Sequence, residues 1–295
     1  MLNFFLIIFF IISIRQMHAQ NLDSLKIKID SIFKSLEGDF SLAFKEVDNE
    51  KNLILINEKM IFHAASTMKT PVMIEVFKQA AENKFNLDDP VEINNEFKSI
   101  ADGSPYYLDI TDDSGEELYK FIGKKKTIYD LVFDMITVSS NLATNILIEL
   151  VGAKNVTETM RSIGANDIQV LRGVEDNKAF QLGLNNVVTA FDLMLIYENL
   201  VENKFASDSL TNEMLNILLQ QKHNSRIPAK LPQDVKVAHK TGSITGVGHD
   251  SGIVFLSDGR KYVLVLLSKN LKDEKAVIEA EAEVSKIIYD YVINN

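Results

Sequence analysis

With 295 residues, 46% of them hydrophobic and 24% charged, the chain has enough apolar material for one large core or two packed subdomains, which excludes a disordered protein. Its net charge of −10, without a block of basic residues, argues against nucleic acid and anionic membranes as partners. The sequence has no cysteine, so neither a disulfide nor a lipid-modified cysteine is available to it.

Residues 1–19 are typical of an export signal. The apolar run over residues 4–14 is too short to span a bilayer, which takes about 20 residues, but it suits the core of a signal peptide. Ala19 closes a tolerable small-residue cleavage site. We expect an exported protein, periplasmic or secreted, without stable membrane association after cleavage. The alternative is an uncleaved N-terminal anchor.

Hydrophobic periodicity predicts β-forming segments at both ends of the chain and helices between them. Residues 22–36 have helical spacing, and residues 38–59 have the pattern of a hairpin around a polar turn. Three strand-like segments between 235 and 270 precede a closing amphipathic helix. The middle of the chain is helical, with helices predicted over 66–85, 127–151, 155–164, 189–203 and 208–221.

This order predicts a single domain over residues 20–295 that is built from two lobes. The terminal pieces, about 20–62 and 222–295, form one sheet with the first and last helices against it, and residues 63–221 form an all-helical lobe. A cleft between the lobes is the expected place for a site. The polar, irregular stretch 90–126 is long enough to be functional, although a surface insertion explains it equally well.

The first candidate motif lies in HAASTMKTPVM, residues 63–73. Ser66 and Lys69 form S-x-x-K in the predicted first turn of a helix. Ser31 and Lys34, in SIFK, match the same pattern. The spacing alone therefore does not decide whether Ser66 is a nucleophile beside its activating amine.

Two further motifs follow along the chain. Ser139 and Asn141 form S-x-N before an apolar helical run, where on their own they are better explained as an ordinary helix cap. Lys240-Thr241-Gly242 ends a β-like run. A lysine beside a threonine hydroxyl on a strand edge can hold a carboxylate, and the glycine lets a substrate approach the backbone, whereas the plainer reading is a glycine turn.

In this order, S-x-x-K, S-x-N and K-T-G resemble the motifs of class A β-lactamases and related penicillin-binding serine hydrolases. The flanks STMKTPV, MITVSSNLATNILI, MRSIGA and HKTGSITG extend the resemblance over nearly all of the mature chain. It implies an α/β fold of the α+β type. A five-stranded antiparallel sheet carries the N- and C-terminal helices, and the active site lies between it and an all-helical lobe.

The chemistry fits this resemblance. A serine hydroxyl needs a base, and Lys69 at i+3 shares a helix face with Ser66. Lysine acts as a base only with a depressed pKa, through burial or a second cation such as Lys240. The resemblance implies that Ser66 is the nucleophile and that Ser139 relays a proton to the leaving nitrogen. It implies substrate binding by Asn141, Lys240, Thr241, Gly242 and Ser243, with the backbone N–H groups of Ser66 and Ser243 as the oxyanion hole.

Two positions depart from the family pattern. Ser140 stands where the family has the aspartate of S-D-N. Glu175 follows Arg172 one residue later than the deacylating glutamate of R-x-E-x-x-L-N, and no L-N follows it. Glu175 is therefore either the general base of a rebuilt loop or a solvated carboxylate. Without a carboxylate to activate water, an acyl-enzyme would persist.

Other residues extend the expected site. The polar loop would border the cleft, so that Tyr106 and Tyr107 could form a wall of the substrate site. Asn145 matches a structural asparagine of the family that steadies the opposite loop. Arg226 is expected to form a surface salt bridge, with added positive charge near the substrate carboxylate as the alternative.

The resemblance predicts a class A serine β-lactamase that opens the β-lactam amide through an acyl-enzyme on Ser66 and confers β-lactam resistance. Within the same fold, a DD-peptidase or esterase that β-lactams acylate and that deacylates slowly is the alternative, and a β-lactam sensor domain is a third. The partner is a small molecule, a β-lactam or a peptidoglycan-like peptide. We expect a monomer without a cofactor, and no metal, because the histidines lack ligand-pair spacing.

Overall fold

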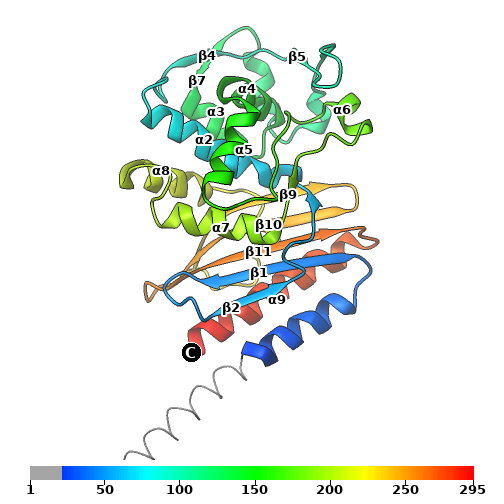
Figure 1. Cartoon of the computed structure of the whole chain (residues 1–295), viewed down its shortest axis with the longest axis vertical. Coiled ribbons are helices and arrows are strands. Elements are labelled where there is room, and N and C mark those ends of the chain that lie inside the picture. The colour runs from blue at the N-terminus through cyan, green and yellow to red at the C-terminus, as the bar shows by residue number, and fades with distance from the viewer. Residues whose placement is uncertain (1–21) are drawn as a thin grey trace, which may run out of the picture.

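The computed structural model describes residues 22–295, which form two lobes stacked along the long axis of the molecule (Figure 1). The predicted signal peptide lies outside the described residues. A helix over residues 22–34 opens the described chain, and α9 (Glu274–Asn294) closes it. Both helices cover the same face of a sheet, on the side away from the helical lobe (Figure 1).

The sheet is antiparallel and has five strands in the order β2-β1-β11-β10-β9. The first two strands come from the beginning of the chain and the other three from its end. This confirms the expected fold class. The bounds are β1 (Asp39–Glu46), β2 (Leu53–Ile56), β9 (Lys236–Ile244), β10 (Val247–Phe255) and β11 (Lys261–Lys269).

Both faces of the sheet are buried. Along β1, Phe40, Leu42 and Phe44 belong to the core under helices 22–34 and α9, whereas Ala43 between them belongs to the core shared with the helical lobe. Successive strand residues point to opposite faces, so a strand covered on both sides is apolar throughout. This explains why the run KYVLVLLSKN lacks the polar alternation of a half-exposed strand.

The helical lobe is arranged around α2, which is buried along almost all of its length. Short strand pairs and 3-10 turns connect the helices. The helices are α2 (Lys69–Ala81), α3 (Ile128–Thr137), α4 (Asn141–Val151), α5 (Ala153–Ser162), α6 (Asn177–Gln181), α7 (Ala190–Val201) and α8 (Asp208–Leu218). The short strands are β3 (Phe62–His63), β4 (Pro90–Glu92), β5 (Phe97–Lys98), β6 (Pro105–Tyr106), β7 (Lys125–Thr127) and β8 (Val187–Val188). The 3-10 turns are η1 (Ala65–Met68), η2 (Ile110–Asp112) and η3 (Glu116–Phe121).

One helix expected from the sequence is divided in two. The periodicity predicts one helix over 127–151, but the structure has α3 and α4 with a break between them. Ser139 in the break has a positive φ of 64°, and the Ser140 hydroxyl caps α4 by accepting the N–H of Ala143 at 3.3 Å. A side-chain cap starts a new helix where the apolar pattern would have continued the old one. The break places Ser139 in the cleft.

The long polar stretch is folded rather than open. It contains β4 to β7 and two 3-10 turns, and Asp113 and Leu118 are buried within it. Among residues 22–295, no helix combines the length and apolar character that a membrane crossing requires.

Candidate active site

Ser66 lies in η1, the tight turn that leads directly into α2. The turn packs against the sheet edge at Gly242 on β9, where an added Cβ would lie 3.0 Å from the backbone nitrogens of Ser66 and Thr67. Any side chain at position 242 would thus crowd the turn that carries Ser66, which gives this glycine a physical role. The first and third motifs are neighbours in space.

The second motif joins them through Lys69. The Lys69 ammonium donates to the carbonyl and the hydroxyl of Ser139, at 2.7 and 3.1 Å, and to Oδ1 of Asn141 at 2.9 Å. The Lys240 ammonium donates to the same Ser139 hydroxyl at 3.1 Å and to the carbonyl of Thr241 at 2.8 Å. One serine hydroxyl therefore lies between two lysines that come from opposite lobes.

Both lysines are fully buried, and burial disfavours their charged forms. It lowers the pKa of Lys69 to about 7, although the carboxylates of Asp113 and Glu175 oppose this shift. Burial and the charge of Lys69 also lower the pKa of Lys240 well below its ordinary value. Two ammonium groups on one hydroxyl repel each other, which favours the release of a proton from the pair. Such a site can supply a neutral amine as a base.

Two cavities meet at Ser66. The first, which we call the loop cavity, has a volume of about 380 Å³ and is lined by Glu175, Val174 and Phe180 among others. The second, the strand cavity, has a volume of about 280 Å³ and is lined by Ser139, Thr241 and Gly242 among others. Ser66, Asn141 and Ser243 border both. Within the described residues the Ser66 hydroxyl has no hydrogen-bond partner, so it is available to a ligand in either cavity.

Glu175 reaches the site although its place in the sequence differs from the family pattern. Its carboxylate accepts the Asn141 side-chain N–H at 2.7 Å, and burial raises its pKa. Its backbone has a positive φ of 60°. Asn145 holds the preceding residue on both sides, accepting the N–H of Val174 at 2.7 Å and donating to its carbonyl at 3.1 Å. The rebuilt loop thus directs a carboxylate into the loop cavity.

The chain is similar to known proteins over most of its length. The model described as "Beta-lactamase enzyme family" matches residues 24–292. The chain belongs to this family. Beta-lactamase VEB-1 of Pseudomonas aeruginosa is 24% identical over 289 residues, which cover 92% of this chain and 91% of that protein.

Solved structures agree with the family assignment. The crystal structure of a beta-lactamase from Sphaerobacter thermophilus DSM 20745 is 26% identical, covers 92% of this chain and 97% of its own, and has a TM-score of 0.76. The structure of PBP-A is 22% identical over 92% of this chain and 97% of its own, with a TM-score of 0.79. At that identity, PBP-A shows a shared fold only.

Tyr106 does not form the wall of the substrate site that was expected of it in this β-lactamase-family protein. It does not line either described cavity. Its hydroxyl donates to the Val174 carbonyl at 3.4 Å and accepts from Asn145 at 3.2 Å, while its ring packs beside Phe97. In the β5–β6 pair Tyr106 lies opposite Phe97, and its partly buried ring packs against the core of the helical lobe. Tyr106 therefore supports the loop that carries Glu175 instead of forming a wall of the substrate site.

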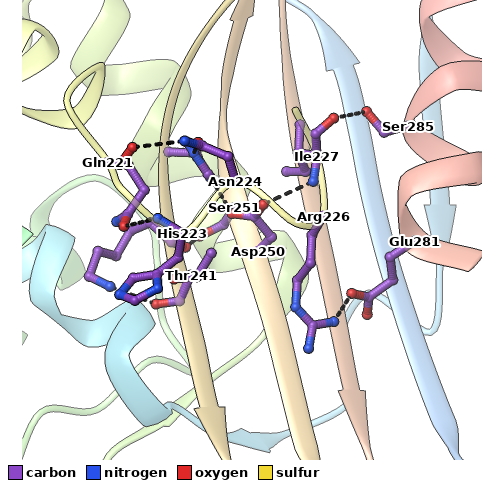
Figure 2. A network of polar contacts seen from close by, with 12 residues as sticks. Gln221, His223, Asn224, Arg226, Ile227, Thr241, Asp250, Ser251, Glu281 and Ser285 are labelled. Atoms are coloured by element: carbon purple, nitrogen blue, oxygen red, sulfur yellow. Dashed lines mark hydrogen bonds and ion pairs between the residues drawn. The ribbon is translucent and has the colours of Figure 1, made fainter. Parts of the chain in front are cut away.

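Arg226 corrects another expectation. It does not form a surface salt bridge: its guanidinium is buried and pairs with Glu281 of α9 (Figure 2). Gly248 provides the space, because a Cβ there would lie 2.5 Å from an Arg226 side-chain nitrogen. Burial raises the pKa of Glu281 to about 7. The pair joins the segment after α8 to the sheet and α9, a contact that sequence spacing could not indicate.

We expect Arg226→Met to lower the free energy of unfolding by about 3–5 kcal/mol at pH 8, because it leaves the Glu281 carboxylate buried without its partner. The loss should shrink toward pH 6, where a carboxyl with a pKa of about 7 or above takes up a proton. Urea denaturation at both pH values measures this. Lys230→Met is the control, since Lys230 pairs with Glu279 and Glu283 at the surface. Equal stability of the two variants would contradict the assignment.

Burial favours the neutral form of the two histidines near the site. Burial lowers the pKa of His63, which lines the loop cavity, and of His223, which lines the strand cavity. Across residues 22–295, no three histidine or carboxylate side chains are grouped in a way that could hold a metal ion.

The competing S-x-x-K pair is remote from this site. Ser31 is exposed on the helix over residues 22–34, and Lys34 pairs with Asp30 one turn away. Neither borders either of the two described cavities. The pairs Ser66–Lys69 and Ser31–Lys34 match the same sequence pattern, but only the first lies at the cavities.

Proposed function

We propose that this member of the beta-lactamase family is a class A type serine β-lactamase, which hydrolyses β-lactams through an acyl-enzyme on Ser66 and so confers resistance to them. The observation that carries the proposal is the state of Lys69, which is buried and has a pKa lowered to about 7. Lys69 and Lys240 both donate to the hydroxyl of Ser139, in the site where the Ser66 hydroxyl is available to a ligand. The family match and the names of the relatives support the substrate class.

In the acylation step, neutral Lys69 takes the proton from Ser66 as its Oγ attacks the β-lactam carbonyl carbon. The backbone N–H groups of Ser66 and Ser243 stabilise the negative charge on the carbonyl oxygen. As the C–N bond of the ring breaks, Ser139 passes a proton from Lys69 to the departing nitrogen. The hydroxyl of Ser139, in contact with both lysines, is suited to this relay. Lys240 and Thr241 bind the substrate carboxylate.

In the deacylation step, we assign the general base to Glu175. Its carboxylate borders the same cavity as Ser66, where a water molecule can attack the ester carbonyl. The hydrogen bond from Asn141 holds the carboxylate in this position. Its raised pKa makes it a stronger base than an exposed glutamate.

One observation favours a second candidate, a DD-peptidase or esterase that β-lactams acylate and that releases them slowly. Glu175 is displaced in the loop and directs its carboxylate to Asn141; among the described residues it has no hydrogen bond to Lys69 or Ser66. A water molecule held differently from that of other family members would slow deacylation. The two candidates share Ser66, Lys69 and the acyl-enzyme, and they differ in the lifetime of that intermediate.

Time-resolved intact mass spectrometry after mixing with benzylpenicillin separates the two candidates. An adduct that appears and then disappears, as penicilloic acid accumulates, supports the β-lactamase. A lasting adduct supports the slow-deacylating enzyme. A wild-type chain that gives neither an adduct nor penicilloic acid would refute both. The start of the mature chain, which we propose to follow Ala19 after export, is read from the mass of protein recovered from the periplasm.

We expect the acylation rate constant to rise with pH and to level off above about pH 7. Lys69 accepts a proton only in its neutral form, and this form predominates above a pKa of about 7. Stopped-flow measurements with nitrocefin from pH 5 to 9 test this expectation. If the acylation rate constant of the Lys69→Gln variant rises with pH in the same way, the titration belongs to another group.

A further inference from the structure

The break between α3 and α4 rests on a carboxylate that belongs to neither helix. Asp113, from the turn after η2, is buried under residues 139–142. One carboxylate oxygen accepts the backbone N–H of Asn141 at 2.9 Å, and the other accepts that of Leu142 at 2.8 Å. These are the first two residues of α4, whose N–H groups have no partner within the helix.

The rest of the segment is built around the same carboxylate. It accepts the N–H of Gly115 at 2.7 Å and the hydroxyl of Tyr119 at 3.1 Å, and the Ser140 hydroxyl approaches it at 3.4 Å. Gly115 packs directly on Ser140: an added Cβ would lie 2.4 Å from the Ser140 Cβ. Two oxygens with this many donors form a fixed junction between the polar loop and the catalytic turn.

We propose that Asp113 is a positioning residue for acylation, which holds the Ser139–Asn141 turn against Lys69 and stabilises the strained backbone of Ser139. The inference rests on the proposed function of Ser66 and adds to it a part that the motifs do not contain. Ser140 carries only a hydroxyl, so the negative charge below this turn comes from the loop. The junction made by Asp113, Gly115 and Tyr119 then serves acylation, and this part of the loop is not a tolerated insertion.

Charge gives this role a signature that packing alone lacks. The charged and titratable groups that interact with Lys69 are Asp113, Glu175, Lys240 and His223. The negative charge of Asp113 favours the ammonium form of Lys69. When Asp113 is made neutral, the pKa of Lys69 falls, and the rise of the acylation rate with pH moves to lower pH.

The test compares Asp113→Asn with Glu116→Gln by stopped-flow acylation with nitrocefin from pH 5 to 9. Glu116 is an exposed acid of the same loop, so its variant removes an equal charge outside the junction. Asp113→Asn keeps the shape but places an amide N–H against donors. We expect its acylation rate constant at pH 8 to fall about 10- to 100-fold, on the scale of one lost charged hydrogen-bond partner. The rise of this rate constant with pH should move to lower pH. Glu116→Gln should stay within twofold of wild type.

The proposal is overturned if Asp113→Asn folds and has the same acylation rate constant and the same pH dependence as Glu116→Gln. If Asp113→Asn does not fold, Gly115→Ala decides, because it keeps the carboxylate and pushes on Ser140: acylation at the wild-type rate would overturn the proposal. Hydrogen–deuterium exchange of a peptide covering 139–142 gives a readout without substrate. Faster exchange of this peptide in Asp113→Asn supports the positioning role of Asp113. It does so even if the wild-type chain does not react with β-lactams, and that second result would refute only the proposed function.

Discussion

Ser66→Ala is expected to abolish covalent labelling of the chain by β-lactams and to lower the acylation rate by more than about 10⁴-fold. Among residues 22–295 no other hydroxyl combines the same features: Ser66 lies where both described cavities meet, its turn leads into the helix that carries Lys69, and Gly242 leaves its backbone accessible. Removal of Oγ leaves Lys69 and Ser139 in place but takes away the atom that forms the ester. Intact mass after a long incubation with benzylpenicillin measures the loss.

Ser31→Ala is the matched control for this prediction. It alters the other S-x-x-K serine, which is exposed on the N-terminal helix, and should leave acylation at the wild-type rate. Folding of both variants is checked by circular dichroism. Undiminished labelling of Ser66→Ala would refute the assignment of the nucleophile and, with it, the roles given to Lys69 and Ser139.

The sequence allowed the main features of the fold to be predicted because they depend on local patterns. Apolar runs at both ends and helical periodicity between them specify the sheet and the helical lobe. The three motifs fall on a helix start, a helix break and a strand edge, where backbone groups or side chains face a cleft. The structure brings Ser66, Lys69, Ser139, Asn141 and Lys240 together.

The remaining features depend on contacts that no local pattern encodes. Asp113 lies in an irregular polar stretch, where neither period 2 nor period 3.6 shows which side chain turns inward. Arg226 and Glu281 are 55 residues apart, and their pairing depends on the space left by Gly248. Tyr106 packs beside Phe97 and bonds to Asn145 and Val174 instead of lining the expected wall. In each case a polar group that is at least partly buried found its partner through tertiary packing.

Glu175→Gln is expected to slow deacylation by about 10²- to 10⁴-fold, the usual contribution of a positioned general base, while acylation changes only a few-fold. The amide can still accept the hydrogen bond from Asn141 but cannot take a proton from water. The acyl-enzyme should therefore accumulate to full occupancy in intact mass spectra. In the wild type, deacylation should decline as pH falls through the pKa of Glu175, which burial places above the ordinary value of about 4.3.

The control for this prediction is Glu58→Gln, another glutamate exchange, at a residue outside both described cavities. Three outcomes separate the hypotheses. A trapped adduct in Glu175→Gln with rapid turnover in wild type assigns the base. Rapid turnover in both means that another group activates the water, and the loop carboxylate is then structural. A lasting adduct in wild type and in Glu175→Gln assigns the chain to the slow-deacylating penicillin-binding enzymes. In that case Glu175 does not act as a base in the wild type, so its substitution does not change the deacylation rate.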